Sequence, residues 1–200
     1  IWKRKLGDKN TSILFENVEN KRDIFFIKKD VPNVKRFYLR EKISDKQLDF
    51  EAYEKASKYS LTAVNKRTGN ISWDVTMDIP GESDVTWMGI TENNIFIQSI
   101  VQKKLFISAY NIGSGDLLWE ISRDISSFYT SFYLSVAFYK ESLLLPLDDR
   151  IEYINAGTGS ISMTYSDEDI EQIYFFNQNS VQGNTMKFII EEKDKDPIIE

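Results

Sequence analysis

The chain has 200 residues, of which 42% are hydrophobic and 14% aromatic, and its formal net charge at pH 7 is −6. It contains no cysteine and no histidine, which excludes disulfides and cysteine nucleophiles and argues against serine–histidine hydrolases and zinc enzymes. Its basic residues form no patch of the kind that binds nucleic acid, and no run of about 18 apolar residues could span a membrane. The high aromatic fraction favours β-strands.

An insertion interrupts the strand pattern near the start of the chain. The segment 23–29, DIFFIKK, is typical of a strand, and residues 31–58 depart from that pattern. Within 31–58, Ser44 and Gln47 have the spacing of a helix capping box, and apolar or small residues then recur every four positions. We expect a short amphipathic helix from about 45 to 57, placed between two strands of the first repeat.

Two interpretations of this insertion stay open at the level of the sequence. It could be a partner-binding arm, because aromatic residues are enriched where proteins bind one another. The candidate anchors are Phe37, Tyr38, Phe50 and Tyr53. It could instead be a helix that packs on the sheets and covers an edge or an apolar patch, which is the favoured interpretation because an amphipathic helix needs a surface on which to bury its apolar face.

Further along the chain, an 11-residue motif occurs three times. AVNKRTGNISW (63–73) is followed by AYNIGSGDLLW (109–119) and YINAGTGSISM (153–163). The copies share a glycine, an asparagine four residues before it and a large apolar residue four residues after it; these are Gly69, Gly115 and Gly159, then Asn65, Asn111 and Asn155, then Trp73, Trp119 and Met163. The glycines are 46 and 44 residues apart, and such a period is typical of solenoids and propellers.

Each copy is expected to form a β-hairpin, because a β-rich segment precedes and follows a turn in which asparagine bonds the backbone and glycine supplies a positive φ. A second pair of strands precedes the later hairpins. We place these pairs at 85–92 and 94–101, and at 132–139 and 142–147. Four short strands in meander order at this period predict the blades of a β-propeller.

The shared pattern, A-x-N-x-x-(T/S)-G-x-x-x-W, resembles the tryptophan-docking repeat of PQQ-like β-propellers, a superfamily that includes quinoprotein alcohol dehydrogenases and the BamB-like outer-membrane assembly lipoproteins. The resemblance implies an all-β propeller of four-stranded antiparallel blades over residues 1–200. About four repeats fit, either as a small closed ring or as part of a larger ring of seven or eight blades. It also implies that Trp2, Trp73 and Trp119, with Met163 as a softer substitute, tie each blade to its neighbour.

The resemblance implies more than one function. Quinoprotein dehydrogenases of the superfamily use a calcium ion, a catalytic aspartate, a stacking tryptophan and often a pair of adjacent cysteines, whereas this chain has no cysteine and no recognisable set of calcium ligands. We therefore expect no catalytic, cofactor or metal site, and no enzyme. The expected function is a protein-binding scaffold similar to BamB-like lipoproteins, in the periplasm and with a lipid anchor as one option.

The alternative is a luminal domain of a stress-sensing transmembrane kinase. Such a domain would lie in the endoplasmic reticulum and would associate with itself through its β edges. Under either reading the partners are proteins, in a membrane-assembly complex or in a self-associated form, and not nucleic acid.

Overall fold

The structure is a computed structural model, and it describes residues 3, 5–7, 10–32, 57–125, 136–147, 150–166, 170–175, 188–192 and 198–199. These residues form β-strands and connecting turns, with no helix among them. Within the same ranges there is consequently no helix long and apolar enough to cross a membrane.

The first sheet shows how each blade is built. Its strands, in spatial and chain order, are β1 (Thr11–Glu19), β2 (Asp23–Asp30), β3 (Lys58–Asn65) and β4 (Ile71–Thr76). Strands β2 and β3 pair over their whole length, from Asp23 opposite Asn65 to Asp30 opposite Lys58. The insertion therefore leaves and re-enters the sheet between two adjacent strands. The helix expected within it, and residues 33–56 as a whole, lie outside the described part of the chain.

The next sheets repeat this meander. The second sheet contains β5 (Asp84–Ile90), β6 (Asn94–Val101), β7 (Lys104–Asn111) and β8 (Leu117–Asp124). The third contains β9 (Ala137–Tyr139), β10 (Ser142–Pro146), β11 (Arg150–Asn155) and β12 (Ile161–Ser166). The fourth, as far as it is described, contains β13 (Ile170–Phe175), β14 (Phe188–Glu192) and β15 (Ile198–Ile199).

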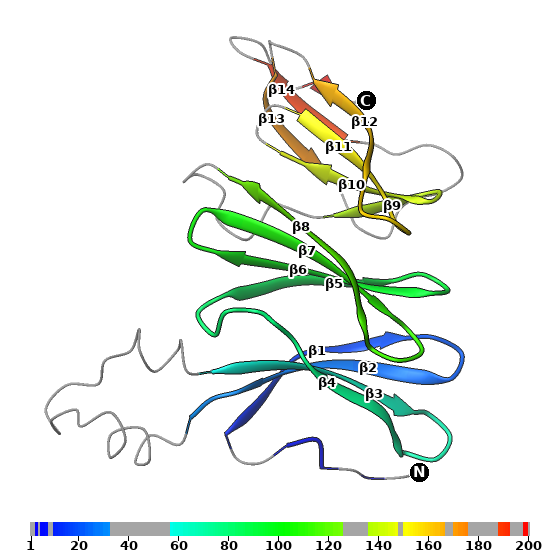
Figure 1. Cartoon of the computed structure of the whole chain (residues 1–200). Helices are drawn as coiled ribbons and strands as arrows, with labels where there is room; N and C mark the ends of the chain where they lie inside the picture. Colours follow the sequence, from blue (N-terminus) through cyan, green and yellow to red (C-terminus); the bar gives the residue numbers. More distant parts are fainter. Residues whose placement is uncertain are drawn as a thin grey trace, which may run out of the picture.

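The first three sheets are stacked in chain order, with the first at the bottom of the view and the third at the top (Figure 1). The fourth sheet packs against the third through β13, which contacts β10 and β11. Stacked four-stranded antiparallel sheets of this kind are part of a β-propeller. The predicted all-β propeller of four-stranded blades is thus confirmed for the fold.

Burial along the strands follows from this stacking. The second strand of the second sheet, β6 (NIFIQSIV), is buried on both faces because other sheets cover both of its sides. The outer strand of the same sheet, β8, alternates between exposed and half-buried residues instead. Burial at nearly every position of β6, and partial burial at alternate positions of β8, therefore reflect inner and outer places in a blade.

Two apolar clusters hold the first three sheets together. Between the first and second sheets, Phe25, Ile27 and Leu61 lie in one cluster with Ile95 and Ile97 of β6, and all five are fully buried. Burial of each such side chain contributes about 1.5–3 kcal/mol. Inter-sheet packing is therefore the main favourable term that joins the blades.

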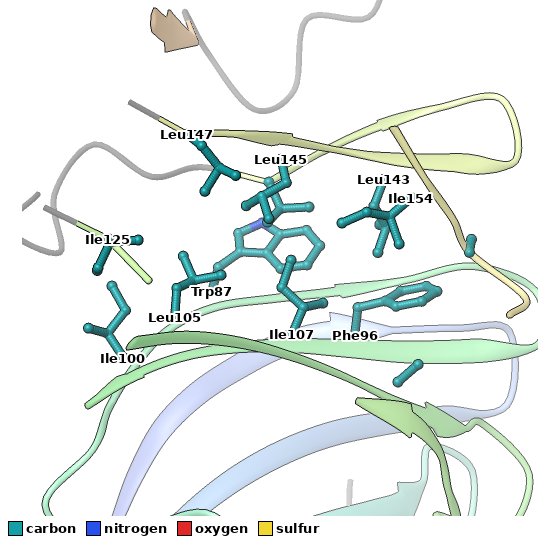
Figure 2. Close-up of a cluster of buried hydrophobic side chains, with 13 residues drawn as sticks. Trp87, Phe96, Ile100, Leu105, Ile107, Ile125, Leu143, Leu145, Leu147 and Ile154 are labelled. Carbon is teal, nitrogen blue, oxygen red and sulfur yellow. The ribbon is translucent and has the colours of Figure 1, made fainter. Parts of the chain in front are cut away.

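The second cluster joins the second and third sheets. Figure 2 shows Trp87, Ile107 and Phe96 of the second sheet directed toward Leu143 and Leu145 of the third. The Phe96 and Phe138 rings meet edge to face, with centroids 5.5 Å apart. Such a pair is favourable beyond the area it buries.

A charged group also lies between the second and third sheets. Glu152 on β11 is 3% exposed, and its carboxylate accepts hydrogen bonds from Arg123 Nε at 2.6 Å and Arg150 Nε at 3.1 Å. Arg123 belongs to β8, so this contact crosses from one sheet to the next. Two guanidinium groups compensate the burial of the carboxylate, which would otherwise be costly.

Candidate functional site

The three repeated turns have one geometry. In the second sheet, Asn111 Oδ1 accepts hydrogen bonds from the backbone N–H of Gly113 at 2.8 Å and of Ser114 at 3.1 Å. The backbone N–H of Gly115 donates to the Asn111 carbonyl at 2.8 Å, and Gly115 has a φ of 79°. The first and third sheets contain the same arrangement at Asn65 and Asn155. The side chain of asparagine thus organises a turn that ends in a left-handed glycine.

Trp73 lies against the turn of the second sheet. Its indole Nε1 donates to the carbonyl of Ile112 at 3.3 Å, and its ring lies over Gly115. A Cβ atom at Gly115 would lie 2.7 Å from Trp73 Cε3 and 3.0 Å from Val75 Cγ1. Both the backbone conformation and the close approach of the ring therefore require glycine at this position.

Trp119 makes the same contact one sheet further along. Its Nε1 donates to the carbonyl of Ala156 at 3.3 Å, and a Cβ atom at Gly159 would lie 2.7 Å from Trp119 Cδ2. Behind the indole, the ring of Phe96 packs at a centroid distance of 5.8 Å. Each tryptophan thus bridges its own sheet and the turn of the following sheet.

Sequence reasoning missed one residue of this contact. Asn94 looks like part of an ordinary Asn-Asn turn, yet it is 8% exposed and its Nδ2 donates to the Ala156 carbonyl at 3.0 Å. That carbonyl therefore accepts from both Asn94 and Trp119. The available signal was an asparagine at the first position of an inner strand, where a buried polar side chain needs a partner.

Met163 occupies the tryptophan position in the third copy, but its surroundings differ. Its side chain is 50% exposed, with Ile161 at 49% and Tyr165 at 43%. These three residues lie on the outer strand β12, with a break in the strand register between Ile161 and Met163, and we call them the β12 stripe. The equivalent Trp73 and Trp119 are packed against the apolar clusters and are only partly exposed.

A hollow of about 520 Å³ lies between the turns of the second and third sheets. Its lining consists of Thr91, Glu92, Asn93, Asn94, Lys140, Glu141, Asn155, Ala156 and Gly157. Over the described ranges, no group of three or more histidine, cysteine, aspartate or glutamate side chains is placed to hold a metal ion.

Tyr110, at the interface between the first two sheets, should make stability depend on alkaline pH. Burial raises its pKa from 10 to about 12, and Glu120 and Asp78 add to the rise while a hydrogen bond with Ser108 opposes it. Above pH 10 the unfolded chain loses this proton first, so the unfolded state binds fewer protons and stability falls as pH rises toward 12. We expect a loss of roughly 2 kcal/mol by about pH 11.5.

The measurement is urea unfolding from about pH 9 to 11.5 for the native chain and for Tyr110→Phe. The variant lacks this ionisation, and the other tyrosines titrate in both proteins. The loss at high pH should therefore be smaller in Tyr110→Phe by the amount given. Equal losses in the two proteins would contradict the assignment to Tyr110.

Several residues predicted from the sequence cannot be placed in this site. The candidate anchors of the insertion and the first docking tryptophan lie outside the described residues; they are Phe37, Tyr38, Phe50, Tyr53 and Trp2. Their roles in partner binding and blade docking stay predictions.

Among solved structures, the chain is similar to a quinohemoprotein alcohol dehydrogenase from Pseudomonas putida HK5, with a TM-score of 0.44 and 12% sequence identity. The similarity covers 71% of this chain and 31% of that one, so the chain spans about a third of the length of that protein. This finding contradicts the prediction that the chain is not an enzyme, because the similar structure is that of a dehydrogenase. No protein-family model and no curated protein sequence matches the chain. The likeness is one of β-propeller fold.

Proposed function

We propose that the chain belongs to the PQQ-like propeller repeat family and acts as a protein-binding scaffold whose β12 stripe contacts the partner. One observation carries the proposal: three large apolar side chains, Ile161, Met163 and Tyr165, are 43–50% exposed along a single outer strand. Contiguous exposed apolar side chains on a protein surface mark interaction sites, whereas isolated ones do not.

The size of the stripe limits what it contributes. Full burial of a large apolar side chain is worth about 1.5–3 kcal/mol, so covering the exposed half of all three contributes on the order of 3 kcal/mol. A micromolar complex needs about 8 kcal/mol. The stripe is therefore the apolar centre of a larger contact, in which polar residues around it, such as Ser162 and Thr164 on the same strand, form the rim.

The resemblance to BamB-like assembly lipoproteins supports a position outside the cytoplasm. We place the scaffold in the periplasm as part of a membrane-assembly complex, with the lumen of the endoplasmic reticulum as the alternative. Fractionation of cells that make the full-length protein tests this placement, and recovery in the cytoplasmic fraction would contradict it.

A photo-crosslinking residue at position 165 tests the binding role of the stripe. With the crosslinker in place of Tyr165 in the full-length protein, irradiation of living cells should give one reproducible adduct with another protein, identified by mass spectrometry. The matched control is the same crosslinker in place of Thr164, which is exposed on the opposite side of β12. Equal adducts from both positions, or none from position 165, would contradict the proposal.

A further inference from the structure

We infer that the hollow between the turns of the second and third sheets binds a guanidinium group. This site is separate from the β12 stripe and goes beyond the proposed scaffold role. Every residue that lines the hollow belongs to the described part of the chain, at the junction of two four-stranded sheets. Its volume of about 520 Å³ lies within the usual range for sites that hold small molecules.

Two carboxylates without partners line the hollow, one from each sheet. Glu92 lies in the turn between β5 and β6, and Glu141 lies in the turn between β9 and β10. Neither carboxylate has a hydrogen-bond or ion-pair partner among the described residues. Lys140, the cation of the lining, has its ammonium 5.1 Å from the centroid of the Tyr139 ring and pairs with neither of them. The lining thus has an excess of one negative charge.

The buried side chain of Asn94 adds a neutral acceptor. Its Nδ2 donates to the Ala156 carbonyl at 3.0 Å, and this bond fixes the direction in which the amide faces. The Oδ1 atom therefore points away from that carbonyl, and it accepts no hydrogen bond from the described residues. Because buried polar atoms are normally satisfied, a ligand with N–H donors would find a preset acceptor here.

The first sheet supplies a guanidinium at the equivalent place. Asp23 and Asn94 are equivalent, because each begins the second strand of its sheet and pairs with the turn asparagine, Asn65 or Asn111. Asp23 is fully buried, and its carboxylate accepts a hydrogen bond from Arg22 Nε at 2.6 Å. The residue directly before this position thus compensates the buried acceptor.

The second sheet has no such cation in its turn. It has Glu92-Asn93 where the first sheet has Lys21-Arg22, so an acid and an amide replace two basic residues. A guanidinium from outside would therefore supply what Arg22 supplies in the first sheet. Its N–H donors lie in one plane and can bond a carboxylate through two parallel hydrogen bonds, whereas an ammonium acts as a point charge.

NMR titration of the isotope-labelled whole chain with ethylguanidinium tests the site. The side-chain amide signal of Asn94 and the backbone signals of Glu92 and Glu141 should shift and saturate at millimolar concentration. Ethylammonium has the same charge without the planar group, and it should bind at least about threefold more weakly. Equal binding of the two probes, or no saturable shift with ethylguanidinium, overturns the inference.

Charge variants separate the hollow from general attraction to an acidic protein. Glu92→Gln and Glu141→Gln should each weaken ethylguanidinium binding roughly threefold, and the double variant about tenfold, since single exposed ion pairs contribute little. Asp84→Asn removes the same charge at the other end of β5, where Asp84 is exposed, and should bind like the native chain. Circular dichroism should show that all variants keep the β fold. Equal weakening by Asp84→Asn overturns the assignment to the hollow.

Asn93→Arg gives the second sheet the residue that the first sheet has. Its own guanidinium should then compete for the hollow and weaken ethylguanidinium binding at least about tenfold. Asn93→Lys adds the same charge without the planar group and should weaken binding only about threefold. Unchanged binding in Asn93→Arg overturns the inference.

Two further probes decide where the guanidinium group comes from. An acetylated and amidated Gly-Arg-Gly peptide presents only the side chain, whereas free arginine adds a charged amino group and a carboxylate. Tighter binding of the peptide assigns the hollow to an arginine side chain of another protein, and tighter binding of free arginine assigns it to a small molecule. Either result supports the guanidinium site, and binding of neither probe overturns it. The crosslink from position 165 tests the scaffold role separately.

Discussion

Replacement of Gly115 by alanine is expected to lower the free energy of unfolding by about 3 kcal/mol. Two costs add: an L-residue with a φ of 79° is disfavoured by roughly 1–2 kcal/mol, and moving the Trp73 ring away from the new methyl group costs about 1–3 kcal/mol. Urea unfolding followed by circular dichroism measures the change, with the denaturant slope unaltered.

The same turn offers a matched control in Gly113. A Cβ atom there would meet only Asn111 Oδ1, at 3.2 Å, and the first repeat carries Arg67 at the equivalent position. Gly113→Ala should therefore change stability by less than about 0.5 kcal/mol. A similar loss in both variants would show that the cost is general to the turn and does not arise from contact with the tryptophan.

Replacement of Trp119 by alanine is expected to cost about 3 kcal/mol, at the lower end of the range for tryptophan truncations because the side chain is only partly buried. The variant loses the packing against Gly159 and Phe96 and leaves the Ala156 carbonyl with one hydrogen bond fewer. Trp119→Phe keeps much of the ring contact and should lose about 1 kcal/mol, the usual net value of a hydrogen bond.

Met163→Ala provides the comparison that links this result to the proposed function. Met163 holds the equivalent position but is 50% exposed, so its truncation should cost less than about 1 kcal/mol. Chemical denaturation of both variants under one set of conditions measures the difference. A loss at Met163 equal to that at Trp119 would mean that the stripe is covered within the chain, and the stripe could not then serve a partner.

The fold could be predicted from the sequence because its main signals are local. Each turn needs an asparagine and a left-handed glycine within five residues, and each strand alternates or is fully apolar according to its place in the blade. The repeat at 69, 115 and 159 then fixes the period of the blades. Three four-stranded sheets appear where this pattern places them.

The remaining features depend on contacts between residues far apart in sequence. Asn94 gains its partner Ala156 only because two sheets stack, and the two residues are 62 positions apart. Glu152 sits among strand residues, and nothing near it in sequence indicates that Arg123 of the preceding sheet will compensate its burial. The exposure of Met163 likewise depends on what stands opposite it in space, which local patterns do not encode.

The contact between Trp119 and Gly159 bears on how such a chain can change its length in evolution. In the second unit, of about 45 residues, the turn at Gly115 receives the indole of Trp73 and, four residues later, Trp119 packs against the turn of the next unit at Gly159. A tandem duplication of one unit therefore creates a copy that matches both of its new neighbours without any compensating substitution. Unequal recombination between such units can lengthen or shorten the array by whole blades.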